Sequence, residues 1–243
     1  IGDSMTGGYG KGPDILHDCT IAVNPGEIAV IVGPNGAGKS TTLRMISTLV
    51  KPDTGSVEVD GVDVLKQPLE VRKHIGFMPH NSGIYPRLTA VENIRYDAEL
   101  SGMKEPHISQ RIDQLIEQLD MASFADRRTE GFSQGQQTKV ALARALVHQP
   151  QTIILDEPTN GLDVMATRGL RDIVRQLRDA GHCVVVSSHV MQEITALCDH
   201  IVIIDEGKVA MQGSVDSIME QTGCEDLEEA FVAAISRAKE QAQ

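Results

Sequence analysis

A glycine-rich loop in the first quarter of the chain could wrap around a phosphate group. Residues 33–40 read GPNGAGKS, which fits the spacing G-x-x-x-x-G-K-[S/T], and they follow the apolar run EIAVIV at 27–32. Glycines let backbone N–H groups turn towards phosphate oxygens, and a helix after the loop would add the positive end of its dipole. Lys39 would then neutralise the β- and γ-phosphates of a nucleotide, and the Ser40 hydroxyl would bind Mg²⁺. The full pattern favours this interpretation over a glycine-rich turn with a surface lysine.

Two adjacent carboxylates follow a second apolar run. The segment TIILDE, residues 152–157, places Asp156 at the end of an expected buried strand and Glu157 directly after it. A carboxylate in that place can hold Mg²⁺ through its water shell, and the second is a candidate base for a water that attacks phosphorus. Alone, such a pair would be the start of a polar loop. Together with the phosphate loop, it predicts hydrolysis of a nucleoside triphosphate.

The composition narrows the classes of protein to consider. The chain has 243 residues, of which 41% are hydrophobic, so it can bury a sizeable core. No apolar run approaches the roughly 20 residues that cross a bilayer, and the first residues lack the pattern of a signal peptide, so we expect a cytoplasmic protein. The excess of 34 acidic over 22 basic side chains gives a net charge of −12, which predicts no nucleic acid partner. The cysteines are widely spaced and are expected to be free thiols: Cys19, Cys183, Cys198 and Cys224.

Short β-branched runs alternate with helical patterns along the chain. We expect strands at 27–32, 152–156, 183–188 and 201–205, because nearly continuous apolar runs are typical of parallel strands buried on both faces. We expect helices at 40–49, 139–147, 165–180 and 191–197. The alternation predicts an α/β fold, the three-layer sandwich of P-loop NTPases with a mostly parallel core sheet.

Other segments interrupt this alternation. GSVEVDGVDV, at 55–64, predicts an antiparallel hairpin that turns at Asp60-Gly61, and a second hairpin is expected at Glu206-Gly207. Residues 86–125 are mostly helical, and one helix places five apolar side chains on one face: Ile108, Ile112, Leu115, Ile116 and Leu119. The pattern predicts one domain over residues 1–243, with an antiparallel β subdomain, an inserted helical subdomain at about 83–145 and a C-terminal helical segment at about 214–243. In that last segment, an amphipathic helix is marked by Leu227, Phe231, Ala234 and Ile235.

Taken in order, the motifs resemble those of the nucleotide-binding (ATPase) subunit of ABC transporters. The phosphate loop is followed by GFSQGQQTKVALARAL at 131–146, which is similar to the family's signature loop and the helix after it. The two carboxylates, the NGLD loop at 160–163 and SSHV at 187–190 come next, in the family's order. The resemblance spans nearly the whole chain. It implies an ATPase that binds ATP and Mg²⁺.

The resemblance also implies a second nucleotide-binding domain, paired head to tail in a homodimer. Each ATP would lie between one phosphate loop and the partner's signature loop, so that Ser133, Gly135 and Gln136 would face the partner's ATP. Asp163 would couple the two sites across the dimer. A helix N-terminus at Ser133 suits a phosphate physically, although FSQGQ is also an ordinary N-cap sequence.

Two side chains receive roles from their places in the family's order. His189 would orient the γ-phosphate and the attacking water, and with Glu157 and Lys39 it forms the predicted catalytic set; a lone histidine after a strand would otherwise be structural. Tyr9 would stack on adenine, unless it is a turn residue. The residues expected to bind the nucleotide are Tyr9, Gly33, Pro34, Asn35, Gly36, Ala37, Gly38, Lys39, Ser40, Thr41, Ser133, Gly135, Gln136 and Asp163.

This sequence departs from the family's pattern at two positions. The usual signature LSGGQ reads FSQGQ, so Gln134 replaces a glycine, which is tolerable if its side chain points away from the nucleotide. His80 stands where the family has a glutamine that contacts Mg²⁺. Histidine can also donate or accept a hydrogen bond, but its charge can change near neutral pH. The candidate metal ligands are therefore Ser40, Asp156 and His80.

Three further segments resemble the ATPase subunits of the sodium-exporting NatA type and related drug and lipid exporters: GIYPRLTAVENI, the signature segment and DLEEAFVAAI. This implies a separate integral membrane permease, on whose cytoplasmic side the chain would sit at the inner face of the cell membrane. An alternative is a non-transport ABC-type ATPase that acts on a soluble macromolecular partner. A kinase or GTPase is disfavoured, because TKVA at 138–141 lacks the aspartate of a guanine-reading motif.

Overall fold

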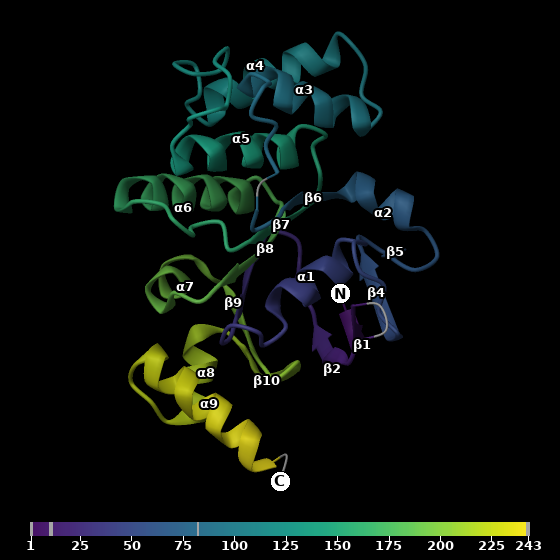
Figure 1. Ribbon diagram of the computed structural model, residues 1–243. Coiled ribbons are helices and arrows are strands. Elements are labelled where there is room, and N and C mark those ends of the chain that lie inside the picture. Colours follow the sequence, from purple (N-terminus) through teal and green to yellow (C-terminus); the bar gives the residue numbers. More distant parts are fainter. Residues whose placement is uncertain (1, 10–11, 82, 242–243) are drawn as a thin grey trace.

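A six-stranded sheet forms the centre of the protein (Figure 1). The computed structural model describes residues 2–9, 12–81 and 83–241, except for the side chains of residues 192–194. The strand order is β10-β9-β3-β8-β7-β6, and every neighbouring pair is parallel except β9 and β10. The strands are β3 (Ile28–Val32), β6 (Ile75–Met78), β7 (Thr152–Asp156), β8 (Cys183–Ser188), β9 (His200–Asp205) and β10 (Lys208–Gly213). Every residue of β3, β7 and β8 is buried, which explains the apolar runs that these strands contain.

A smaller antiparallel sheet covers one face of this core. Its order is β2-β1-β4-β5, formed by β1 (Gly2–Gly8), β2 (Asp14–Ile21), β4 (Thr54–Val59) and β5 (Val62–Asp63). The predicted hairpin at Asp60-Gly61 is confirmed, since Val59 pairs with Val62. Helix α1 (Lys39–Ile46) lies between the two sheets and buries Leu43 and Met45. Helix α2 (Pro68–His74) connects β5 to β6.

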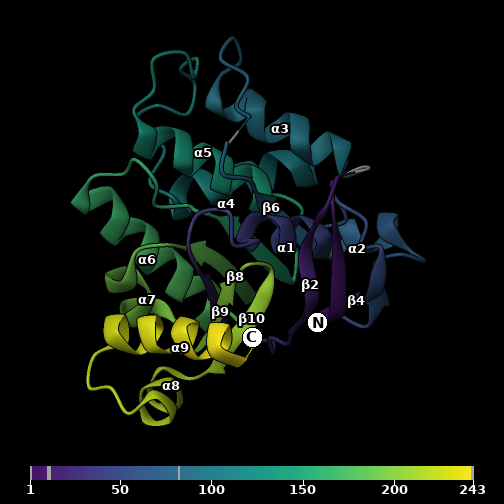
Figure 2. The same ribbon diagram turned by 60° about the horizontal axis from the view of Figure 1, so that its bottom comes forward.

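The other face of the core sheet is covered by helices (Figures 1 and 2). Helices α3 (Ala90–Leu100), α4 (His107–Gln118) and α5 (Gln134–Leu146) lie between β6 and β7 in the chain. The predicted apolar face of α4 is confirmed, because four of its five residues are buried and Ile116 is partly buried against the same core. Helices α6 (Val164–Asp179) and α7 (Met191–Leu197) pack beside β8. The alternation of strands and helices thus gives the predicted α/β sandwich.

The C-terminal helices α8 (Val215–Thr222) and α9 (Leu227–Gln241) form a unit beside β9 and β10. The predicted amphipathic helix is confirmed, because α9 buries Leu227 and Ala234 and partly buries Phe231 and Ile235. Residues 242 and 243 of the predicted C-terminal segment lie outside the described residues. The division of the chain into subdomains at residues 83, 145 and 214 stays a prediction.

Several element boundaries differ from those predicted. Helix α1 ends at Ile46 rather than Leu49, since Thr48 takes the left-handed conformation with φ 66°. Helix α5 begins at Gln134 rather than Lys139, because Ser133 and Gln136 form a capping box. That polar first turn carries no apolar periodicity from which the sequence could predict it.

All four cysteines are free thiols, as predicted. Burial raises the pKa of Cys19 and of Cys183 to about 11, so that both stay protonated near neutral pH. Over the described ranges, no helix is both long enough and apolar enough to cross a membrane.

Candidate nucleotide-binding site

The phosphate loop occupies the turn between β3 and α1. Gly38 is the N-cap of α1 and has φ 111°, a backbone conformation that residues with a side chain rarely adopt. A Cβ at this position would also lie 2.6 Å from Leu16 Cδ2. The loop therefore requires glycine at this position. It aims the N-terminus of α1, with its free N–H groups and the positive end of its dipole, into the space in front of the loop.

Lys39 is held inside the loop rather than in solvent. Its side chain is 6% exposed, and Nζ donates to Gly33 O at 2.8 Å and to Pro34 O at 3.2 Å. Nζ also lies 3.7 Å from Glu157 Oε1. A surface lysine, which was the alternative explanation of the motif, would have none of these contacts. The ammonium group is therefore fixed inside the loop, where its predicted role requires it.

Asp156 ends β7 beneath the phosphate loop and is fully buried. Its Oδ1 accepts hydrogen bonds from Ser40 Oγ at 2.9 Å and from Ser187 Oγ at 2.8 Å. Its buried Oδ2 has no hydrogen-bond partner among the described residues. Burying a carboxylate oxygen without a hydrogen-bond partner costs folding free energy. The place of this oxygen near the Ser40 hydroxyl fits a hard cation such as Mg²⁺, which prefers oxygen ligands.

Glu157 and His189 form a hydrogen-bonded pair at the mouth of the site. His189 Nδ1 lies 2.6 Å from Glu157 Oε2, with the histidine half-exposed and the glutamate nearly buried. Glu157 has φ 52°, an uncommon conformation for a non-glycine residue, and its N–H donates to Ser187 Oγ at 2.8 Å. Such strain clusters at functional sites. Ser187 therefore contacts both acids: the carboxylate of Asp156 and the backbone of Glu157.

These groups surround an open pocket of about 560 Å³. Predicted residues that line it come from the phosphate loop with the start of α1 and from the segments directly after β6, β7 and β8: Asn35, Gly36, Gly38, Lys39, Ser40, Thr41, His80, Glu157 and His189. The sequence did not single out Ile15 and Asn160, which also line it, or Ser187 behind it. Asn160 and Ser187 lie inside the NGLD and CVVVSS segments, so their motifs were a signal, whereas Ile15 on β2 gave none.

The remaining residues of the phosphate loop support the pocket from behind. Gly33 and Pro34 supply the carbonyls that hold Lys39, and Ala37 is buried. Tyr9 lies at the edge: its hydroxyl accepts from Arg44 Nη1 at 2.7 Å and from Thr41 Oγ1 at 3.4 Å. Tyr9 itself does not line the pocket, and the Arg44 guanidinium lies over its ring with Cζ 5.8 Å from the ring centroid, so the stacking on adenine stays a prediction.

The predicted signature residues lie elsewhere. Ser133, Gly135, Gln136 and Asp163 line a second groove, of about 660 Å³, between α5 and α6. Ser133 Oγ accepts from Gln136 N at 3.3 Å and Asp163 Oδ1 accepts from Ala166 N at 2.8 Å, so both are helix N-caps. In the part of the chain that the structure describes, none of the four lines the first pocket, so one chain brings together only part of the predicted binding set. The Gln134 side chain leans towards Gly161 of the same chain, with Cγ 3.5 Å from a Cβ built there.

The donor set fits a magnesium ion that shares its ligands with a nucleotide. No group of three or more His, Cys, Asp or Glu side chains that could hold a metal exists among the described residues. Mg²⁺ commonly uses one or two protein oxygens and completes its shell with phosphate and water. Ser40 and Asp156 meet this need. His80, the third predicted ligand, is exposed and lines the same pocket, and its role at the metal stays a prediction.

We expect Ser187→Ala to lower kcat for ATP hydrolysis about tenfold, with KM for ATP changed less than about threefold. The variant removes the hydroxyl that fixes the Asp156 carboxylate and the Glu157 backbone, while leaving the phosphate loop intact. Steady-state kinetics would measure both constants. Ser188→Ala is the matched control, because its Oγ accepts from Val190 N and it lies on the same strand. Equal losses in the two variants would show that the effect comes from strand packing.

Known proteins resemble this chain in sequence. The profile of the family described as "ABC transporter" matches residues 16–160, more than half of the chain. The chain is 40% identical over 223 residues to "ABC transporter ATP-binding protein NatA" of Bacillus subtilis, a match that covers 91% of each chain. It is 34% identical over 230 residues to "Linearmycin resistance ATP-binding protein LnrL" of the same organism, covering 95% of this chain and 74% of that one.

Solved structures show the same likeness in three dimensions. A structure titled "Structure of ATP binding subunit of ABC transporter" superposes with a TM-score of 0.87 at 29% identity, covering 96% of this chain and 98% of that one. A dimeric post-hydrolysis state of the ATP-binding cassette MJ0796, bound to ADP and Pi, gives a TM-score of 0.80 at 27% identity, covering 88% of this chain and 97% of that one. The chain therefore belongs to the ABC transporter family, as an ATP-binding domain that hydrolyses ATP.

Proposed function

We propose that this chain powers an exporter by closing on ATP as a head-to-tail homodimer beneath a separate membrane permease. The proposal rests on one observation: within one chain, the predicted nucleotide-binding residues lie in two separate places. The phosphate loop lies on one pocket, and Ser133, Gly135 and Gln136 lie on another groove. A second copy placed head to tail would supply the missing half of each site, with the N-terminus of α5 directed at the γ-phosphate.

Within the closed site, each side chain would have one task. Lys39 would bind the phosphates with the N–H groups of the loop, and Glu157 would accept a proton as the attacking water forms its bond to the γ-phosphorus. The bond from that phosphorus to the bridging oxygen then breaks, and ADP and phosphate leave. His189, 2.6 Å from Glu157 Oε2, would orient this carboxylate and the water. A magnesium ion held by Ser40 and Asp156 would neutralise phosphate charge.

The transported substrate would be handled by the permease. Two of the relatives bear names that mention NatA and linearmycin resistance, and the sequence resemblance extends to sodium, drug and lipid exporters. We propose sodium or a drug-like molecule as the cargo, moved outwards, with the chain held at the inner face of the membrane through its permease. A non-transport ABC-type ATPase remains the alternative, in which a soluble macromolecule would replace that permease.

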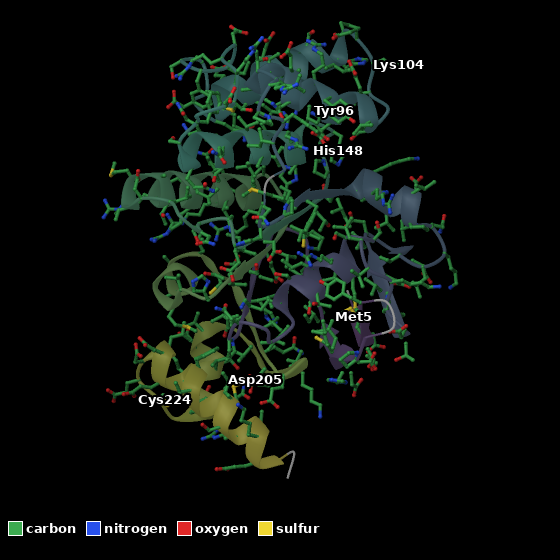
Figure 3. The ribbon with its side chains drawn as sticks, in the orientation of Figure 1. Met5, Tyr96, Lys104, His148, Asp205 and Cys224 are labelled. Carbon is green, nitrogen blue, oxygen red and sulfur yellow. The ribbon has the colours of Figure 1, made fainter. Side chains whose placement is uncertain are left out.

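A groove of about 290 Å³ between β6, α3 and α5 is the proposed permease contact. His148 and Asp97 line it, and Figure 3 labels His148 and the neighbouring Tyr96. Apolar side chains stay exposed beside it on the segment from residue 80 to residue 100, among them Tyr85, Tyr96 and Leu100. Exposed apolar surface beside a groove is typical of a protein contact. Movement of this segment, which begins at His80 in the nucleotide pocket, would reach the permease.

We expect Leu100→Glu to lower transport by the complete transporter at least about fivefold, while the isolated subunit binds ATP as before. Leu100 is 69% exposed, so the substitution places a charge on the proposed contact without disturbing the core. Uptake into inverted vesicles and ATP titration of the subunit would measure the two effects. Leu69→Glu is the matched control, at 73% exposure on α2. If the two variants transport equally well, the contact lies elsewhere; if ATP binding falls with transport, the surface belongs to the fold.

A further inference from the structure

The turn between β9 and β10 supports the phosphate loop from behind. Gly207, in this turn, donates its N–H to Ala37 O at 2.9 Å, and its carbonyl accepts from His17 N at 2.8 Å. At the other end of the loop, a Cβ on Gly33 would lie 2.1 Å from Ile204 O, so the two backbones are in contact. The loop that is proposed to bind phosphate therefore rests at two points on one hairpin.

The C-terminal helix packs beside this same hairpin, and one of its lysines reaches the turn. Lys239 of α9 places Nζ 3.2 Å from Asp205 Oδ2 and 3.4 Å from Glu206 Oε1. Asp205 is only 10% exposed, and it raises the pKa of Lys239, which keeps the ammonium charged. Figure 3 labels Asp205 beside the yellow C-terminal helix, and Figure 2 shows the C-terminal end of α9 next to β10. The two acids directly precede Gly207, which contacts the phosphate loop.

Helix α9 is held in place by contacts that do not involve Lys239. Its buried face includes Leu227, Ala230 and Ala234. Arg237, two residues before Lys239, donates to Gln221 O at 2.7 Å and to Thr222 O at 3.0 Å, which ties α9 to the end of α8. Removing the Lys239 amine would leave these contacts in place.

We propose that Lys239 is a positioning residue for ATP binding, acting on the phosphate loop through the turn at Asp205 and Glu206. The inference rests on the proposed role of residues 33–40 as the phosphate loop. Without the lysine, the nearly buried Asp205 carboxylate loses its cation, and the turn loses its tie to α9. The loop would then sample more conformations before ATP binds, so affinity falls while chemistry in the bound complex is preserved. A partner that shifts α9 would change ATP affinity by the same route.

The size of the effect is bounded by the exposure of the pair. Lys239 is 53% exposed, and ion pairs with one exposed partner contribute little, but the nearly buried Asp205 strengthens this one. We expect Lys239→Ala to raise the Kd and KM for ATP about two- to fivefold, with kcat changed less than about 1.5-fold. Lys239→Arg, which keeps the charge, should restore the parent constants.

Lys208 provides the matched control for lost charge. It begins β10 directly after the turn at Glu206-Gly207 and borders the same pocket as Lys239. Across residues 2–9, 12–81 and 83–241 it forms no ion pair. Lys208→Ala removes one positive charge, and with it the same long-range attraction for ATP, while the ion pairs of Lys239 with Asp205 and Glu206 remain. ATP titration by calorimetry, steady-state kinetics and thermal unfolding would be measured on all three variants and the parent.

The proposal is supported by a loss of affinity in Lys239→Ala that exceeds the loss in Lys208→Ala and is restored in Lys239→Arg. Equal losses in the two alanine variants, an unchanged Kd, or a drop in melting temperature alone would overturn it. Lys39→Ala separates this inference from the one on which it rests. If Lys39→Ala binds ATP like the parent, the phosphate-loop assignment fails; if it loses binding while Lys239→Ala does not, only the positioning role fails.

Discussion

Replacing Lys39 with alanine will reduce ATP hydrolysis at least about a hundredfold and weaken ATP binding. The ammonium group is 6% exposed and fixed by two loop carbonyls, so it is already oriented for phosphate before ATP arrives. Removing a preorganised charge from a site that excludes water typically lowers rates by two to three orders of magnitude. The variant also removes the ammonium group that lies 3.7 Å from Glu157 Oε1. The Glu157 carboxylate, no longer neutralised, would then repel the phosphates of ATP.

Two measurements would test this prediction. Phosphate release would report hydrolysis, and calorimetric titration with Mg-ATP would report binding. Lys51→Ala, at an exposed lysine shortly after α1, removes the same charge outside the pocket and should behave like the parent. Hydrolysis by Lys39→Ala within tenfold of the parent rate would contradict the role given to the loop.

The Glu157→Gln variant should lose hydrolysis about a hundred- to a thousandfold while keeping its affinity for ATP within about threefold. Glutamine has nearly the same shape, so the backbone at φ 52° and the contact with Ser187 can persist. An amide cannot accept the proton of the attacking water, so only the chemical step is lost. Because the substitution removes a negative charge near Lys39, it should slightly strengthen binding of the phosphates.

Single-turnover phosphate release would separate this loss from slow product release. Glu220→Gln, at an exposed glutamate on α8, is the control for the loss of one charge, and it should hydrolyse ATP at the parent rate. A Glu157→Gln protein that still turns over within tenfold of the parent would assign the base to another group.

Most strands of the core sheet could be predicted from the sequence, because a strand that is buried on both faces has a nearly continuous apolar sequence. Each of the strands β3, β7, β8 and β9 contains an apolar run, which reads IAVIV, IIL, CVVV and IVII in turn. The sequence patterns did not predict β2, α2 or β6. The last is only four residues long, IGFM, and α2 has one buried residue, so neither carries a full period of either element.

The site was predictable where it follows a local motif and not where it depends on pairing between distant strands. The phosphate loop and the acids at 156 and 157 were visible as short segments. The contact of Ser187 with Asp156 depends on the parallel register of β7 and β8, in which these two residues are partners, and no local spacing reveals it. Ile15 reaches the pocket only because β2 lies over α1 and the hairpin turn.

We propose that two copies of this chain complete each other's ATP sites. The most direct test is size-exclusion chromatography with light scattering on Glu157→Gln, with and without Mg-ATP. We predict a change from one chain per particle to two when Mg-ATP is present, reversed when Ser133→Arg is added at the signature loop. A variant that binds Mg-ATP yet stays at the mass of one chain would contradict the head-to-tail dimer.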